Sequence, residues 1–120
     1  MLATSTADVA TALTWAHQHR VPVSVRGAGT GLAGGAVAYD QGLVISLERC
    51  TKIRQIDPVN RLAVVEAGVI TADLDRAARE HGLFFPPDPA SVETSTVGGN
   101  IATNAGGLRC IAHGVTRDSV

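Results

Sequence analysis

TVGGNIATNAGG, residues 96–107, is the most informative stretch of this 120-residue sequence. It is rich in glycine and alanine, and its polar side chains at Asn100, Thr103 and Asn104 are uncharged. Small residues let a flat ring or another backbone lie close. Side-chain amides can donate and accept hydrogen bonds to the carbonyls and ring nitrogens of a heterocycle. The stretch, called here the second glycine run, predicts a short helical turn that supports a heterocyclic ligand; a turn that merely fills a gap is the structural alternative.

RGAGTGLAGG, residues 26–35, forms a first glycine run, and together the two runs hold nine of the 13 glycines. Successive N–H groups of such a loop can converge on an anion, and Arg26 at its entrance can add positive charge. Residues 29–34 form a GxGxxG motif, but only eight residues separate Gly34 from the next strand-like run at Leu43. That is too little chain for the crossover helix of a Rossmann dinucleotide site. We therefore expect a strand, a loop that wraps a pyrophosphate, and a strand.

The pattern along the remaining chain predicts an α+β fold. A helix capped by Ser5 is expected to end near Arg20, with an apolar stripe of Val9, Ala12, Leu13 and Ala16. Strands are expected at residues 21–25, 43–47, 52–57 and 62–67, the last two joined by a turn at 58–61. A second helix is expected with Thr71 as its cap, Leu74, Ala77 and Ala78 facing inward, and Gly82 at its C′ position. Prolines make residues 84–89 extended and irregular.

Composition excludes several classes of protein. A net charge of −1 argues against general attraction to nucleic acid or anionic membranes. Cys50 and Cys110 are expected to be free thiols, and the four histidines show no metal-ligand spacing, so no metal is predicted. No nucleophile-and-base pair is recognisable, and no catalytic residue is assigned. The lack of an apolar run of about 18 residues and of a signal peptide predicts a cytoplasmic protein.

Both runs resemble segments of FAD-linked oxidases of the vanillyl-alcohol oxidase type, which carry a PCMH-type FAD-binding domain. Residues 26–35 are similar to the pyrophosphate loop, and residues 86–89 followed by 96–109 are similar to the second flavin-contacting segment. With residues 114–118, the second segment resembles the branch of the glycolate oxidase FAD subunit, D-lactate dehydrogenase and D-2-hydroxyglutarate dehydrogenase. The resemblance implies that residues 1–120 are a PCMH-type FAD-binding domain, namely its first α/β subdomain and the start of the second. It implies that this domain is incomplete at both ends and that the substrate domain is absent.

The cofactor implied by the resemblance is FAD. Binding is expected to be non-covalent, because members that attach FAD covalently often carry a histidine in the first loop and residues 26–35 contain none. The implied cofactor contacts are Arg26, Gly27, Ala28, Gly29, Thr30, Gly31, Leu32, Gly34, Gly35, Pro87, Asp88, Thr96, Gly98, Gly99, Asn100, Ala102, Thr103, Asn104 and Gly107. One departure is His113, which stands where the family usually has an aromatic residue.

The implied activity is oxidation of a small 2-hydroxy acid of the glycolate, D-lactate or D-2-hydroxyglutarate type. In the family, hydride passes to flavin N5, and an acceptor such as a quinone, a cytochrome or an electron-transfer flavoprotein reoxidises the flavin. The alternatives are an FAD enzyme acting on an alditol, a lactone or an ether-lipid precursor, and a non-catalytic nucleotide-binding module. The family's substrate contacts and catalytic base lie beyond residue 120. These 120 residues alone are therefore expected to be inactive and to bind FAD weakly or not at all.

Overall fold

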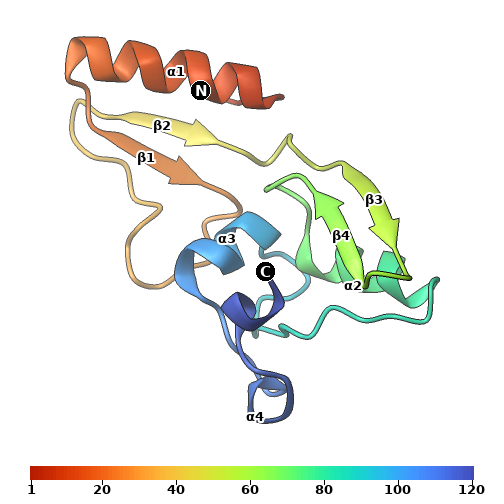
Figure 1. Ribbon diagram of the computed structural model, residues 1–120. Helices are drawn as coiled ribbons and strands as arrows, with labels where there is room; N and C mark the ends of the chain where they lie inside the picture. Colours follow the sequence, from red (N-terminus) through yellow and green to blue (C-terminus); the bar gives the residue numbers. More distant parts are fainter.

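Helices and strands are mixed along the chain, with α3 lying between two small sheets (Figure 1). The computed structural model describes all 120 residues and is elongated, with extents of 47 × 27 × 20 Å. The elements are α1 (Thr6–His19), β1 (Val23–Arg26), β2 (Leu43–Ser46), β3 (Ile53–Asp57), β4 (Leu62–Val65), α2 (Thr71–Arg79), α3 (Val97–Thr103), α4 (Cys110–His113) and a 3₁₀ helix, η1 (Thr116–Ser119). The expected α+β class is confirmed.

The first sheet pairs β1 with β2 in parallel, in the register Val23↔Leu43. The first three residues run parallel to the other edge of β2, where Ala3 N–H donates to Ser46 O and Ser46 N–H donates to Met1 O, both at 2.9 Å. Residues 27–42 connect β1 to β2 as a loop that contains no helix, as expected. The absence of a crossover helix confirms that the GxGxxG motif does not begin a Rossmann unit.

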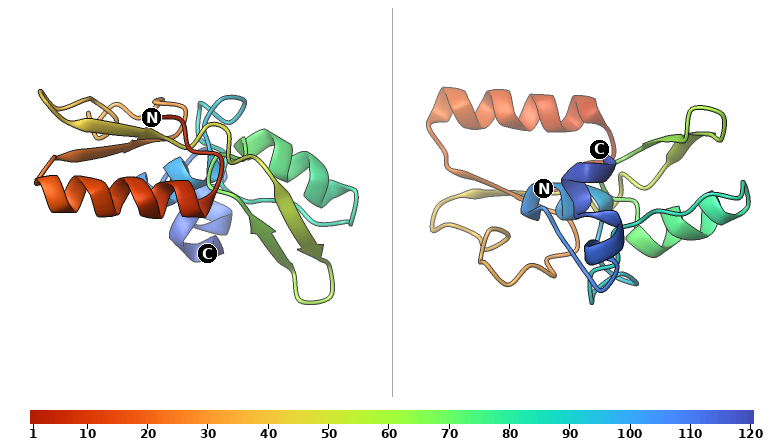
Figure 2. Two further views of the ribbon diagram at one scale, coloured as in Figure 1. Left: turned by 90° about the horizontal axis from the view of Figure 1, so that it is seen from above. Right: turned by 60° about the horizontal axis from the view of Figure 1, so that its bottom comes forward.

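Helix α1 lies along one face of this sheet (Figure 2). Its start is as expected, because Ser5 Oγ accepts the N–H of Asp8, and the Asp8 carboxylate in turn accepts the N–H of Thr4. Ala12 and Ala16 are buried, whereas Leu13 is 43% exposed, so its expected inward position is wrong. The sheet beneath pairs only two strands, with residues 1–3 at its edge, and it buries Ala12 and Ala16 but not Leu13.

The second sheet is the antiparallel hairpin of β3 and β4, joined by the turn expected at residues 58–61. The Asp57 carboxylate accepts the N–H groups of Val59 and Asn60, each at 3.0 Å, which closes the turn. One side of the hairpin packs against a small core of Val69, Leu74 and Val97. The hairpin thereby places the chain for α2 and α3.

Helix α2 begins differently from the prediction. Its N-cap is Ile70, without a side-chain cap, and Thr71 is the first helical residue. The Thr71 side chain is fully buried, and its hydroxyl bonds to Ser95 and to Asn100 instead of to the helix start. A buried hydroxyl needs partners where no water reaches it, and the neighbouring loop supplies them. At the other end the C-cap is Glu80, which makes His81 the C′ residue, so Gly82 lies one residue further along than predicted.

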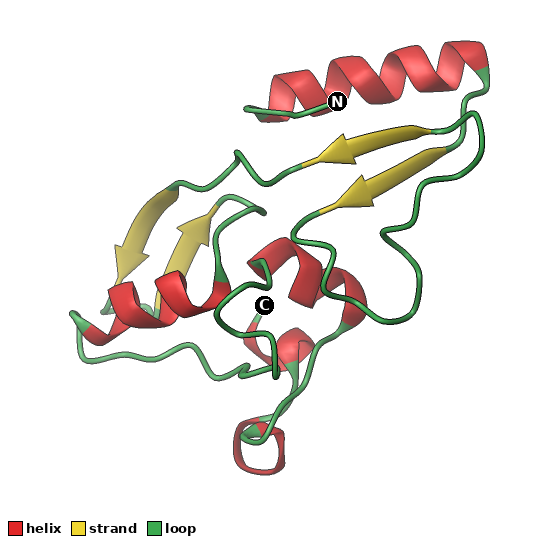
Figure 3. Ribbon diagram, turned by 180° about the vertical axis from the view of Figure 1, so that it is seen from behind, coloured by secondary structure: helices red, strands yellow, loops and turns green.

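Residues 84–95 return from the far end of α2 to the start of α3 as a long loop (Figure 3). Their first half is extended and irregular, as the prolines predicted, and Pro87 and Pro89 are buried. The loop ends where Ile70 and Thr96 form an isolated antiparallel bridge. No helix of the chain combines the length and apolar character needed to cross a membrane.

Candidate cofactor site

The two glycine runs meet in space at the end of β1. Gly27 follows β1 directly, and a Cβ atom at this position would collide with the side chain of Thr96, the N-cap of α3. Further along, a Cβ atom at Gly31 would lie 3.9 Å from the Thr103 methyl group at the end of α3. The missing side chain at Gly27 therefore allows the loop to lie against the helix. The convergence of the two runs is a feature of the folded chain that their separation in sequence hides.

The first glycine run offers a row of free donors. From Gly27 to Ala36 no backbone N–H donates to a protein acceptor, and most of these residues are exposed. The carbonyls are partly used, since Gly35 O accepts the Ser24 hydroxyl at 3.1 Å. Unpaired N–H groups in a glycine-rich loop suit a ligand with several anionic oxygens.

A cavity of about 420 Å³ opens along this loop. It contains six of the predicted contacts, Arg26, Gly27, Ala28, Gly29, Gly31 and Gly34, together with Ala36, Val37 and Glu48. Thr30, Leu32 and Gly35 lie on the same loop outside the lining. Glu48, which the sequence pattern did not single out, adds an acidic residue to the lining of the cavity. The donors of this cavity are thus mostly backbone groups.

The start of α3, by contrast, has no free donors. Val97 N–H donates to Val69 O at 2.8 Å, Gly98 N–H to Ala67 O at 2.9 Å, and Gly99 N–H to Thr96 Oγ1 at 3.2 Å. These bonds satisfy the N–H groups that a helix end normally leaves open. The free backbone donors therefore lie on the loop beside α3 and not at the helix terminus.

The side chains of α3 divide between the interior and the surface. Asn100 is 2% exposed, and its Nδ2 donates to Thr71 Oγ1 at 2.7 Å. Ala102, Thr103 and Asn104 are exposed, and Asn104 Oδ1 accepts the N–H of Arg117 at 3.0 Å. Asn100 thus fixes α3 to the start of α2, and its amide nitrogen is not offered to a ligand.

A second cavity of about 710 Å³ lies between α2, residues 85–93 and residues 106–109. Three predicted contacts, Pro87, Asp88 and Gly107, line it. The predicted contacts on α3 and its cap line neither cavity. The predicted site is therefore divided into a loop cavity and this larger one, with α3 packed against the loop.

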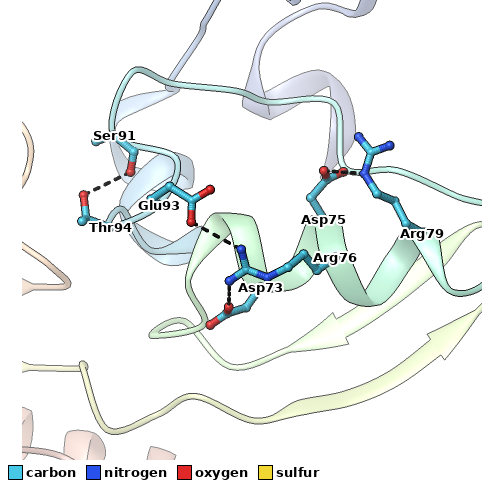
Figure 4. A network of polar contacts seen from close by, with 7 residues as sticks. All are labelled: Asp73, Asp75, Arg76, Arg79, Ser91, Glu93 and Thr94. Carbon is cyan, nitrogen blue, oxygen red and sulfur yellow. Dashed lines mark hydrogen bonds and ion pairs between the residues drawn. The ribbon is translucent and has the colours of Figure 1, made fainter.

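Charged side chains of α2 and of the segment after it pair with one another (Figure 4), and Asp75, Arg76 and Glu93 among them line the larger cavity. The Arg76 guanidinium bonds to Asp73 and to Glu93, and these two carboxylates raise its pKa. Arg109 Nε lies 3.5 Å from Asp88 Oδ2. Because both arginines that line the cavity already face carboxylates, this cavity attracts an anion less than its two cations suggest.

His113 stands where the resembled family usually has an aromatic residue, and here it packs against the ring of Phe84. Its imidazole meets Phe84 edge to face, with ring centroids 5.2 Å apart. The pair joins α4 to the extended segment after α2. Elsewhere, both cysteine thiols are free, and no three His, Cys, Asp or Glu side chains come together as a metal-binding group.

The chain is similar in sequence to several curated oxidoreductases. The chain is 47% identical over 116 residues to glycolate oxidase subunit GlcD of Bacillus subtilis strain 168, which covers 97% of the chain and 25% of that protein. It is 49% identical over 113 residues to D-lactate dehydrogenase of Archaeoglobus fulgidus, covering 94% of the chain and 25% of the relative. A D-2-hydroxyglutarate dehydrogenase of Xanthomonas citri pv. viticola is 45% identical over 116 residues, covering 97% of the chain and 25% of the relative. The chain thus spans about a quarter of the length of these relatives.

Solved structures share the fold. Alkyldihydroxyacetonephosphate synthase superimposes with a TM-score of 0.87 at 25% identity, covering 98% of this chain and 24% of that one. For 6-hydroxy-D-nicotine oxidase of Arthrobacter nicotinovorans the TM-score is 0.81 at 27% identity, and the match covers 98% of this chain and 25% of that one. The model of one family, described as the FAD binding domain, matches residues 1–120. With its donor-rich loop against a helix of small residues, the chain belongs to this family of FAD binding domains.

Proposed function

We propose that residues 26–36 bind the pyrophosphate of FAD, and that the protein is an oxidoreductase acting on a small 2-hydroxy acid. The observation that carries the first part is the row of unpaired N–H groups from Gly27 to Ala36 beside α3. A pyrophosphate presents several anionic oxygens within a few ångströms, which matches consecutive backbone donors. Arg26, which is exposed, adds a cation at the entrance of the loop.

The two glycine runs also suggest which residues contact the rest of the FAD molecule, beyond its pyrophosphate. The exposed residues Ala102, Thr103 and Asn104 supply small and uncharged surface on α3, close to the loop at Gly31. Pro87, Asp88 and Gly107 form part of the larger cavity. Thr96, Gly98, Gly99 and Asn100 act by fixing α3, because their groups bond within the protein. No histidine lies in the loop, which supports non-covalent binding.

The reaction class is supported by the relatives, whose names are glycolate oxidase subunit GlcD, D-lactate dehydrogenase and D-2-hydroxyglutarate dehydrogenase. FAD supplies the capacity to accept a hydride from such a substrate. The role proposed for the 120 residues is to bind and orient the cofactor, and none of them is assigned to proton transfer. We propose a quinone, a cytochrome or an electron-transfer flavoprotein as the acceptor that receives the electrons.

An absorption spectrum of the protein produced from its complete reading frame tests both parts. Flavin bands at about 370 and 450 nm are expected. Loss of the band near 450 nm on anaerobic addition of glycolate, D-lactate or D-2-hydroxyglutarate is expected, with L-lactate as the control for stereochemistry. A protein that stays colourless after incubation with FAD would overturn the cofactor proposal.

A second candidate function keeps FAD and changes the substrate. It is favoured by the fold shared with alkyldihydroxyacetonephosphate synthase and 6-hydroxy-D-nicotine oxidase, neither of which is named for a 2-hydroxy acid. A yellow protein whose flavin is reduced by dithionite but by none of the three acids would favour this candidate. Flavin that resists reduction by every substrate class would favour a nucleotide-binding module without redox function.

A further inference from the structure

We propose that Asp88 is a positioning residue of the cofactor site. Its carboxylate holds residues 106–109, the end of the second glycine run and the residues after it, in the conformation that forms one wall of the larger cavity. The inference rests on the proposed function, because the wall matters only if FAD lies against it. It differs from the simpler expectation that Asp88 contacts the cofactor directly.

Both carboxylate oxygens of Asp88 face Arg109. Oδ1 accepts the backbone N–H of Arg109 at 3.0 Å, and Oδ2 lies 3.5 Å from the Nε of the same residue. The Asp88 side chain is only 17% exposed, so these contacts are partly shielded from water. One side chain therefore fixes both the backbone and the guanidinium of Arg109.

Gly107 shows how closely the two segments approach. A Cβ atom at Gly107 would overlap the backbone carbonyl and the carboxylate of Asp88. Any other residue at 107 would push the segment away and break the Asp88–Arg109 contacts. The glycine and the aspartate thus form one contact, separated by 19 positions in sequence.

Asp88 can act as an anchor because its own segment is held firmly. Pro87 and Pro89 are buried on either side of it and restrict the backbone. Helix α2 fixes the segment before and after the prolines. Asp75 Oδ1 accepts the N–H of Phe85 at 2.9 Å, and Val92 O accepts the N–H of Ala72 at 3.0 Å.

The other end of the short stretch is held by η1. Ala105 O accepts the N–H of Thr116 at 3.0 Å and the Thr116 hydroxyl at 2.7 Å, and Thr116 is fully buried. Residues 105–109 are therefore clamped by Thr116 on one side and by Asp88 on the other. Removal of the Asp88 carboxylate frees one end of this wall and leaves the Arg109 cation unpaired beside the cavity.

The test compares D88A, D88N and the control D57A in the protein made from its complete reading frame. Asp57 also bonds backbone N–H groups but lines neither cavity. Three quantities are measured: the Kd for FAD, the visible circular dichroism of the bound flavin, and hydrogen exchange of the Arg109 amide in the apoprotein. The last measurement needs no cofactor and shows whether the wall loosens in a protein that is still folded.

For D88A we expect faster exchange at Arg109, an FAD Kd raised about tenfold or more, and an altered flavin dichroism. D88N keeps an acceptor for the Arg109 N–H, so it should recover most of the protection and of the affinity. D57A should change the thermal midpoint without changing the Kd.

Wild-type affinity and dichroism in a folded D88A protein would overturn the inference while leaving the proposed function intact. An equal loss of affinity in D88N and D88A, with Arg109 still protected in both, would also overturn it, because it would indicate direct contact with the cofactor. A wild-type protein that binds no FAD would overturn the proposed function and this inference with it.

Discussion

Asn100 on α3 donates a 2.7 Å hydrogen bond to the hydroxyl of Thr71, the first residue of α2, and both side chains are buried. The Thr71 hydroxyl also lies 2.9 Å from Ser95 Oγ and 3.0 Å from Ser95 O. The bonds of this single hydroxyl connect the starts of two helices and the loop between them. The position of α3, and with it the exposed face proposed for the cofactor, depends on this buried polar contact.

Replacement of Thr71 by valine tests that dependence. The change keeps the shape of the side chain but leaves Asn100 Nδ2 without its acceptor, so the free energy of unfolding should fall by about 1–3 kcal/mol. Urea denaturation followed by far-ultraviolet circular dichroism measures it. T14V is a matched control, because Thr14 is exposed and its hydroxyl bonds only to Ala10 O within its own helix; a loss as large as that of T71V would contradict the prediction.

Replacement of Gly27 by alanine should separate the loop from α3. The added methyl group meets Thr96, and the resulting shift should raise the Kd for FAD about tenfold or more. G82A is the control: Gly82 lines neither cavity and has a φ of +71°, so alanine there should lower the stability without changing the Kd. Fluorescence titration of FAD against both variants measures the difference. Equal affinity for G27A and wild type would show that the contact with Thr96 is not needed for binding.

Stability should fall in acid because of Glu66. Its carboxylate accepts the N–H of Lys52 at 3.0 Å and pairs with Arg54 at 2.9 Å, which lowers its pKa below the ordinary value of 4.5. A group with a lowered pKa in the folded state stabilises the protein above that ordinary value. The contribution is lost as the pH falls through the lowered pKa.

The urea midpoint should therefore decline as the pH is lowered below about 4.5, and the decline should be smaller in E66Q, which cannot titrate. Asp8 and Asp57 also have lowered pKa values, from hydrogen bonds with Thr4 and Asn60 respectively, so some acid sensitivity should remain in E66Q. A pH profile for E66Q identical to that of the wild type would contradict the role of Glu66.

The two cysteines should react at different rates. Burial raises the pKa of the Cys50 thiol, and the nearby carboxylates of Glu66 and Asp8 add to the effect. Cys110 is only half-buried. Because the thiolate is the reactive form, an alkylating reagent at neutral pH should label Cys110 first. Mass spectrometry of the native protein after timed alkylation measures the order, and faster labelling of Cys50 would indicate that its core opens.

Local patterns predicted the elements well, and contacts distant in sequence explain what they missed. The helix start at Ser5, the hairpin turn at Asp57 and the extended proline segment each depend on neighbours a few residues away. Thr71 was expected to cap α2 because threonine often does so. Its actual partners, Ser95 and Asn100, come from a loop and a helix that fold back onto it, and no local pattern indicates them.

The candidate site shows the same division. Glycine spacing predicted the loop from Gly27 to Gly35, and its short connection to β2 correctly excluded a crossover helix. The meeting of Gly27 with Thr96 and of Gly107 with Asp88 requires the folded chain. Periodicity marks which face of a helix is apolar, but it does not say how wide a surface will cover that face, which is why Leu13 remains exposed.

The loop proposed for the pyrophosphate is also the only connection between two parallel neighbouring strands, β1 and β2. Closing such a crossover has an entropic cost, and a ligand that binds the folded loop but not the unfolded chain offsets part of that cost by mass action. We expect the polypeptide to be degraded faster in cells that are short of cofactor. The abundance of the protein would then follow the supply of FAD, which immunoblotting of cells grown with limiting and with ample riboflavin measures.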